Sequence, residues 1–279
     1  MQPLEARRPT SFSSLAEHAL APGRVHSALC TLYPAPMFRA VLFDLWETLI
    51  NDKPERAQPR RAWRTGAVQD VLQRYKVDAE LDAIQAALDA STYALTRLHD
   101  DGKDLDAGGR SRLFIAQLQT TANVQAPDAA VNDLEDVITS MPLDIAPMVA
   151  PFAVDTAAAI KARGWATALV CNAGFTTTPH LLPMLAHYGL SPHLDVMVFS
   201  DQLGYAKPDP RIFARALEGL GLVAADCAFV GDNPHTDIAG AQAVGMFAVQ
   251  VGSKQRDGIT PDARIDDLSG LLGVLDGIS

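Results

Sequence analysis

The sequence predicts an α/β protein built on a doubly wound parallel sheet, with an all-helical region inserted into it. Short apolar segments typical of buried parallel strands recur along the chain, and the first of them begins at residue 40 and ends at a carboxylate, Asp44. Helical patterns separate these segments after residue 152. Between residues 51 and 151 the pattern is almost continuously helical, which indicates the insertion.

The composition is that of a globular chain that can form a substantial core. The 279 residues are 48% hydrophobic, and no apolar run approaches the roughly 18 residues that a membrane span needs. A net charge of −10 would repel nucleic acid and anionic membranes, so we expect neither as a partner. Cys30, Cys171 and Cys227 are too few and too far apart for a disulfide framework or a zinc site. This cysteine usage fits a reducing compartment, so we expect a cytoplasmic protein.

Residues 1–36 differ from the rest of the chain, because they contain Ser- and Pro-rich stretches without sustained periodicity. We expect a loosely ordered N-terminal extension. A targeting peptide is an alternative, although this segment has no long apolar stretch of the kind that directs secretion. Since Met37 stands just before the first strand, a start codon assigned too far upstream explains the extension equally well.

The remaining residues divide into an α/β core, residues 37–52 and 150–279, and a helical module, residues 53–149. Within the module, Gly, Pro and Asp residues indicate breaks at residues 100–102, 106–109 and 125–128. Later strands of the core are expected at residues 165–170, 194–199, 227–230 and 246–251, with a short edge strand at 261–265. Core helices are expected at residues 154–162, 176–188, 210–219 and 237–244.

Polar residues follow four of the expected strands, at the positions where open α/β sheets bind ligands. They are Asp44 after the first strand, Cys171 and Asn172 after the second, Ser200, Asp201 and Lys207 after the third, and Asp232 and Asp237 after the fourth. Right-handed crossovers place the ends of parallel strands on one edge of the sheet. The sequence therefore predicts that these residues meet in one site.

The charged residues of this set suit chemistry on a phosphate group. Asp44 can act as an anionic nucleophile if a metal ion reduces the repulsion between its carboxylate and the phosphate. Asp232 and Asp237, together with Asp44, offer the hard oxygen ligands that Mg²⁺ prefers. Lys207 offers a positive charge for a phosphate oxygen, and Pro208 is suited to the first position of a helix whose dipole favours an anion.

The order of these residues, Asp, then a Ser-like residue, then Lys, then Gly-Asp-x₄-Asp, resembles the haloacid dehalogenase-like (HAD) hydrolase superfamily. The resemblance covers about residues 38–270, and the helical module resembles the helical (C1-type) cap that closes over the catalytic face in that family. It implies a Mg²⁺-dependent phosphohydrolase that acts on a small phosphorylated metabolite, an ester or an anhydride, through an aspartyl-phosphate on Asp44. It also implies that the backbone carbonyl of Trp46 is a further metal ligand.

Trp46 is the departure from the family pattern with the largest chemical consequence. The family's phosphatases carry a second aspartate at this position, which protonates the leaving oxygen and then activates water. General acid–base help is typically worth about 10²- to 10⁴-fold, so we expect slow turnover of alkyl phosphates. The favoured substrates then have good leaving groups, or they receive a proton from the cap. His235, between Asp232 and Asp237, is a candidate substitute acid or else an exposed loop residue.

Other departures concern the phosphate-binding positions. Cys171 replaces the Ser or Thr that binds the phosphoryl group in the family, and a thiol donates poorly. We therefore expect Asn172 and backbone N–H groups to complete the phosphate cradle. Thr48 is expected to hydrogen-bond near the nucleophile, as in related proteins, and Glu47 replaces a more usual Gly. Three arginines of the first module helix form either a substrate contact for a second anionic group or a solvated face: Arg60, Arg61 and Arg64.

Two other functions compete with the phosphohydrolase. A 2-haloacid dehalogenase is one, because those relatives also lack the second aspartate and commonly have an aromatic residue in its place. They need no metal, however, and the retained Asp232 and Asp237 argue against this function. The other is a non-catalytic phosphate-binding or regulatory protein, which Trp46 and Cys171 suggest. The sequence makes no prediction of oligomeric state.

Overall fold

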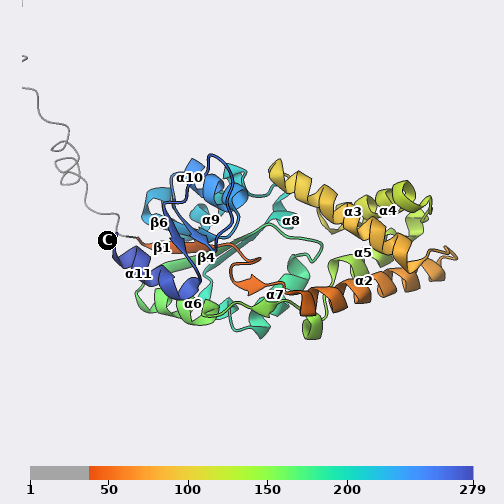
Figure 1. The fold of residues 1–279 in the computed structure, drawn as a ribbon, viewed down its shortest axis with the longest axis horizontal. Helices are drawn as coiled ribbons and strands as arrows, with labels where there is room; N and C mark the ends of the chain where they lie inside the picture. The colour runs from red at the N-terminus through yellow and green to blue at the C-terminus, as the bar shows by residue number, and fades with distance from the viewer. Residues whose placement is uncertain (1–37, 279) are drawn as a thin grey trace, which may run out of the picture. The chain divides into compact units, whose positions relative to one another are not determined.

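The computed structural model describes residues 38–278, so the extension expected at residues 1–36 lies outside the described residues. Six parallel strands form one sheet in the order β5-β4-β1-β6-β7-β8 (Figure 1). The strands are β1 (Ala40–Phe43), β4 (Ala166–Cys171), β5 (Val196–Phe199), β6 (Cys227–Gly231), β7 (Phe247–Val251) and β8 (Ala263–Ile265). This topology confirms the predicted parallel sheet, including the edge strand, and places β1 near its centre.

Helices cover both faces of the sheet, as Figure 1 shows. Along β1, Val41 and Phe43 belong to one apolar cluster, whereas Ala40 and Leu42 belong to a second. Side chains of a strand alternate between faces, so the two clusters lie on opposite sides of the sheet. The first cluster contains residues of α6 (Ala153–Ala162), α7 (Thr178–His187) and α11 (Leu271–Asp276). The second contains residues of α9 (Pro210–Leu220) and α10 (Gly240–Ala243). The sheet is therefore doubly wound, as predicted.

A set of helices with its own apolar core follows β1 in the chain and precedes β4. The helices are α2 (Pro54–Arg74), α3 (Leu81–Asp100), α4 (Ala107–Ala122) and α5 (Val131–Thr139). Their buried faces meet in a cluster that includes Leu72, Ile84, Phe114 and Leu134. Each fully buried aliphatic or aromatic side chain of this kind contributes about 1.5–3 kcal/mol, so burial of these faces is the main stabilising term for the helices.

Two local predictions differ from the structure. The break expected at residues 106–109 is wrong, because α4 begins inside it. The Asp106 side chain accepts a hydrogen bond of 2.6 Å from the backbone N–H of Gly109 and caps the helix. The helix expected at residues 237–244 starts earlier, with a π-helical turn at Pro234–Ala239 that continues into α10. Such turns are frequent at functional sites, and this one carries Asp237.

Backbone pairing between the helical set and the core includes two places far apart in the fold's connectivity, the chain crossings and the α3–α4 loop. The chain passes between the core and the helical set twice. These two segments, β2 (Ile50–Asn51) and β3 (Met148–Val149), pair as an antiparallel ribbon that is too short to show as a pattern in the sequence. At the other place, the loop between α3 and α4 pairs with the chain after β5. The N–H of Asp104 donates to the carbonyl of Gly204 at 3.1 Å, and the N–H of Ala206 donates to the carbonyl of Gly102 at 3.0 Å.

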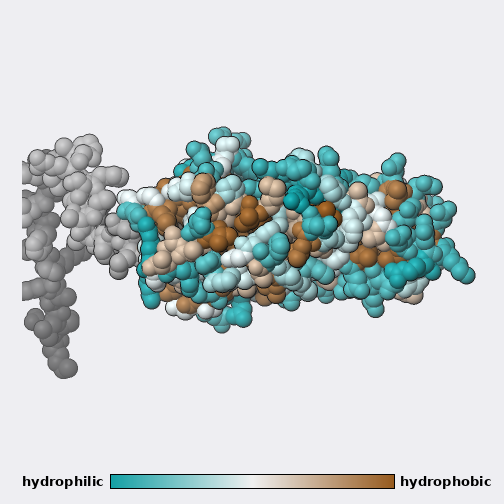
Figure 2. Space-filling model, turned by 90° about the horizontal axis from the view of Figure 1, so that it is seen from below, coloured by the Kyte–Doolittle hydropathy of each residue, from teal (hydrophilic) through white to brown (hydrophobic). Residues whose placement is uncertain are grey.

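Hydrophobic residues on the surface are scattered among hydrophilic ones. On the face drawn in Figure 2, brown patches alternate with teal ones. Tyr93, Phe152 and Val223 are examples of exposed hydrophobic residues, and they come from distant parts of the chain. Scattered residues of this kind are normal on protein surfaces. Within residues 38–278, none of the helices has the length and apolar character needed to cross a membrane.

Candidate active site

Three buried carboxylates meet at the edge of the sheet that the sequence analysis singled out. Asp44 directly follows β1, and Asp232 directly follows the adjacent strand β6. Asp237 reaches the same place from the π-helical turn. One oxygen from each of the three side chains lies within 4.8 Å of the others, and all three residues are buried. The structure therefore brings together the three acidic residues predicted to share a site.

Lys207 lies between two of these carboxylates. Its Nζ is 2.6 Å from Oδ1 of Asp44 and 2.8 Å from Oδ1 of Asp237, and the lysine is buried. The Asn172 side chain holds the backbone of this lysine. Its Nδ2 donates to the Lys207 carbonyl at 2.9 Å, and its Oδ1 accepts from the Lys207 N–H at 2.8 Å. Both polar atoms of the Asn172 amide are thus engaged in positioning Lys207.

The electrostatics of the site favour an additional cation. Burial outweighs the opposing charge of Lys207 and, reinforced by the charges of Asp237 and Asp232, raises the pKa of Asp44 to about 7. Burial also raises the pKa of Asp232, against an ion pair with Lys254. For Lys207, burial lowers the pKa, but the neighbouring carboxylates outweigh it and the net pKa is raised. Lys207 therefore keeps its positive charge, while the carboxylates repel one another.

The donor set of this cluster fits a magnesium ion. Mg²⁺ binds carboxylate oxygens and substrate phosphate oxygens, and the three aspartates supply hard oxygen atoms at one point. A divalent ion there would offset the mutual repulsion that raises the pKa of Asp44. Asp44, Asp232 and Asp237 are the residues that could hold the metal. The predicted contribution of the Trp46 carbonyl stays a prediction.

The structure places two other predicted residues away from the carboxylate cavity. Cys171, the last residue of β4, is fully buried in the first apolar cluster, and burial, followed by the charge of Asp44, raises the pKa of its thiol well above the ordinary value. Thr48 is buried, its Oγ1 has no hydrogen-bond partner within residues 38–278, and it lines a neighbouring cavity together with Asp232 and Lys254. Their predicted substrate contacts stay predictions.

The helix after Lys207 begins at Pro210, as expected from the range predicted for it, residues 210–219. Pro208, suggested as its first residue, instead lies two residues before it, and the side chain of Asp209 caps the helix by accepting a hydrogen bond from the N–H of Arg211 at 2.9 Å. Either Pro208 or Pro210 would suit the first turn of the helix, and the cap by Asp209 fixes the start at Pro210.

The carboxylates and Lys207 line a cavity of ≈ 160 Å³ that also has walls from the helical set. Trp46, two residues after Asp44, lines it, and Asn172, which directly follows β4, also contributes. From α3 the cavity receives Thr96, His99 and Asp100. His235 is not among its lining residues; its Nε2 lies 3.2 Å from the carbonyl oxygen of Asp100. His235, the candidate acid identified from the sequence, therefore does not line the cavity that contains Asp44.

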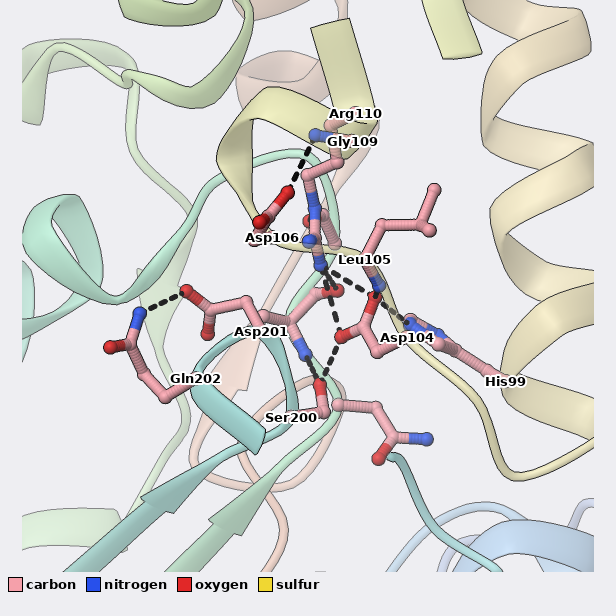
Figure 3. A network of polar contacts seen from close by, with 12 residues as sticks. His99, Asp104, Leu105, Asp106, Gly109, Arg110, Ser200, Asp201 and Gln202 are labelled. Atoms are coloured by element: carbon pink, nitrogen blue, oxygen red, sulfur yellow. Dashed lines mark hydrogen bonds and ion pairs between the residues drawn. The ribbon is translucent and has the colours of Figure 1, made fainter. Parts of the chain in front are cut away.

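His99 is a candidate that sequence reasoning missed. Its Nε2 lies 3.2 Å from Oδ1 of Asp104, as Figure 3 shows. Asp104 also accepts a hydrogen bond from the Ser200 hydroxyl, whose oxygen in turn accepts from the N–H of Ala173. A signal was available, because His99 continues at helical spacing the stripe of buried residues along α3: Ile84, Leu88, Leu95.

The same aspartate binds a fully buried arginine. Nη2 of Arg110 donates to both oxygens of Asp104, at 2.9 and 3.0 Å, and to the carbonyl of Ala173 at 2.8 Å (Figure 3). Nε of Arg110 donates to the carbonyl of Gly174 at 2.8 Å. Burial raises the pKa of Asp104, but the neighbouring His99 imidazole and the charge of Arg110 outweigh it and hold the pKa below its usual value. We call His99, Asp104, Arg110 and Ser200 the clasp, because they join α3 and α4 to the core.

This fold and site agree with one family of hydrolases. A family model of haloacid dehalogenase-like hydrolases matches residues 38–245. The chain belongs to this family.

Named phosphatases are among its relatives. A phosphoserine phosphatase from Thermus thermophilus is 38% identical over 112 residues, which are 39% of this chain and 43% of that protein. The mouse haloacid dehalogenase-like hydrolase domain-containing protein 3 is 35% identical over 122 residues, 42% of this chain and 47% of that protein. The chain thus spans less than half the length of each of these two relatives.

Solved structures of related proteins share the fold over most of this chain. A 2-haloacid dehalogenase from Pseudomonas syringae has a TM-score of 0.62 at 23% identity and covers 87% of this chain and 100% of its own. A HAD phosphatase from Thermococcus onnurineus has a TM-score of 0.62 at 21% identity, with coverage of 86% and 99%. At these identities the likeness concerns the fold.

Proposed function

We propose that this chain is a Mg²⁺-dependent phosphohydrolase of the helical-cap (C1-type) subgroup that acts on a small phosphate ester or anhydride. The observation that carries the proposal is Lys207, held between Asp44 and Asp237 in a cavity that Asp232 also lines. The phosphatases among the relatives support it. In this proposal residues 53–149 form the cap, and residues 37–52 and 150–279 form the core.

The chemistry follows from what each residue offers. An oxygen of the Asp44 carboxylate attacks phosphorus, the bond from phosphorus to the leaving oxygen breaks, and the leaving oxygen takes a proton. Water then cleaves the aspartyl-phosphate and restores the carboxylate and inorganic phosphate. Lys207 binds a phosphate oxygen and stabilises the charge that develops on it. Mg²⁺, when held by Asp44, Asp232, Asp237 and the Trp46 carbonyl, supplies positive charge that reduces the repulsion between carboxylate and phosphate.

The assay that tests this proposal varies substrate and metal together. Purified protein is given 4-nitrophenyl phosphate, acetyl phosphate and 2-chloropropionate, with Mg²⁺ or with EDTA. We expect Mg²⁺-dependent release of phosphate and no release of chloride. Chloride release in EDTA would establish the dehalogenase instead. Calorimetric binding of the phosphate esters with no turnover of any of them would establish the non-catalytic function.

Gly231→Ala is expected to weaken the metal site. A Cβ at Gly231 would lie 2.5 Å from Cγ of Asp237, so the alanine displaces that carboxylate. Displacing a group that orients a metal ligand typically costs about 10- to 100-fold in metal affinity, and we expect a loss of that size for Mg²⁺ by calorimetry. Gly273→Ala is the control, because a Cβ there meets open space. Equal Mg²⁺ affinities for the two variants would show that Asp237 is not a ligand.

His99→Gln is expected to slow the hydrolysis of esters with poor leaving groups selectively. His99 lines the cavity with Asp44, is oriented by Asp104, and in this proposal delivers the proton that Trp46 cannot. Turnover of propyl phosphate should fall about 100-fold, whereas 4-nitrophenyl phosphate, whose leaving group needs no proton, should lose about fivefold or less. His235→Gln should show no such difference. A uniform loss on both esters in His99→Gln would assign His99 a structural role only.

A further inference from the structure

A second cavity adjoins the one that contains the carboxylates. Its volume is ≈ 240 Å³, and it shares Trp46, Thr96, His99 and Asn172 with the first cavity. Its other walls come mainly from α2, α3 and the turn after β4, and include Arg60, Arg64, Phe175 and Thr176. A ligand bound at Asp44 can therefore extend past Trp46 into this space.

Arg64 is a cation on this wall that forms no ion pair among residues 38–278, although Asp52 lines the same cavity. Its Nη2 donates to the carbonyl of Ser140 at 3.1 Å and to the hydroxyl of Thr176 at 3.3 Å, and both acceptors are neutral. Its Nε is buried and has no hydrogen-bond partner among the described residues. Arg60, one helical turn earlier, pairs with Asp52, and Arg61 pairs with Asp89 at 2.7 Å on the exposed side.

Burial makes this unpaired charge costly. Burial and the neighbouring charge of Arg60, which Asp52 partly opposes, lower the pKa of Arg64 to about 10. Arg64 is still cationic at neutral pH, so the second cavity carries a desolvated positive charge. The indole Nε1 of Trp46 is a second buried donor on the same wall without a partner among residues 38–278. The same wall carries Asp52, whose Oδ2 pairs with Arg60 and whose Oδ1 has no hydrogen-bond partner among the described residues. Two arginines against this one carboxylate leave the wall with a net positive charge, which complements an anion.

We propose that this second cavity binds a carboxylate of the substrate, and that the substrate is a phosphate monoester of a short hydroxy acid. The phosphate lies at Asp44 and Lys207, the carboxylate lies at Arg64, and Trp46 lies between them. This proposal rests on the phosphohydrolase function for the position of the phosphate. The combined small size of the two cavities selects a short carbon chain between the two anionic groups.

The test compares two esters that differ in one charge, O-phosphorylated 3-hydroxypropanoate and propyl phosphate. The wild-type protein should prefer the carboxylated ester in kcat/KM. A charge-assisted hydrogen bond is worth about 10- to 100-fold, so Arg64→Gln should lose about that factor on the carboxylated ester and less than about threefold on propyl phosphate. Arg64→Lys should recover part of the loss. Arg61→Gln is the matched control and should leave both esters unchanged. The bisphosphate of 1,3-propanediol shows whether a second phosphate is accepted instead.

Binding of 3-hydroxypropanoate, which carries no phosphate, separates this proposal from the proposed function. Calorimetry on the wild-type chain should detect this anion, and Arg64→Gln should lose it while its melting temperature stays close to that of the wild type. If no phosphate ester is hydrolysed but this binding is observed, the phosphohydrolase fails and the anion site stands. Equal losses on both esters, a preference for propyl phosphate or the bisphosphate, or no Arg64-dependent binding would overturn the carboxylate site.

Discussion

Asp44→Asn is expected to eliminate turnover, with a loss of at least about 10³-fold in kcat, because the asparagine amide cannot form the aspartyl-phosphate. The fold should survive the change. The substitution would remove one of three buried carboxylates that repel one another, and Lys207 would keep its ion pair with Asp237 at 2.8 Å. Steady-state kinetics on 4-nitrophenyl phosphate, with thermal unfolding of the same samples, measure both outcomes.

The control for this variant lies at the opposite end of the same sheet. Asp226 directly precedes β6, whereas Asp232 directly follows it, and Asp226→Asn should change kcat by less than about twofold. An Asp44→Asn protein with more than a tenth of the wild-type activity would exclude Asp44 as the nucleophile. A variant that is inactive because it is unfolded would be recognised by its lost thermal transition, and Asp44→Glu would then replace it as the test.

Arg110→Met is expected to destabilise the protein by about 3–5 kcal/mol, the usual cost of breaking a buried ion pair by removing one partner. Arg110 and Asp104 are both fully inaccessible at their side chains. The methionine would leave the Asp104 carboxylate without its bidentate partner, and the carbonyl oxygens of Ala173 and Gly174 would lose their donor. Chemical denaturation followed by circular dichroism gives the free energy of unfolding.

An exposed arginine provides the matched comparison. Arg61 pairs with Asp89 on the surface, where both side chains are about half exposed, and Arg61→Met should cost less than about 1 kcal/mol. Combining Arg110→Met with Asp104→Leu removes both charges and should recover part of the loss. Equal stabilities for Arg110→Met and Arg61→Met would show that the buried pair contributes nothing to folding.

The carboxylate site could be predicted from the sequence because each of its parts is local. Asp44 and Asp232 each end a short apolar run, and the crossover rule then places both runs at one edge of the sheet. Placing the two runs at one edge needs no knowledge of contacts between residues distant in the sequence. The pairing of β1 with both β4 and β6 is the physical reason that the prediction holds, since it puts the ends of three strands side by side.

The contribution of the helical set could not be predicted in the same way. Whether Arg110 meets the carbonyl of Ala173 depends on how α4 packs against a loop 63 positions away, and no local pattern encodes that contact. A buried arginine on a helix looks like any solvated one in the sequence. The same holds for Arg64: its spacing from Arg60 and Arg61 suggested one charged face, whereas the structure gives the three side chains different surroundings.

Asp104 contacts both His99 and Arg110, so these two contacts cannot be altered separately by a substitution of Asp104. One of its oxygens lies 3.2 Å from Nε2 of His99 at the cavity, and it pairs with Arg110, so a substitution of Asp104 would affect both the proposed proton donor and the attachment of the helical set to the core. Under the proposed function, a substitution that loosened the clasp to speed product release would also displace His99, the proposed proton donor. Variants with faster product release should therefore be sought first in the β2–β3 ribbon, which contains none of the clasp residues.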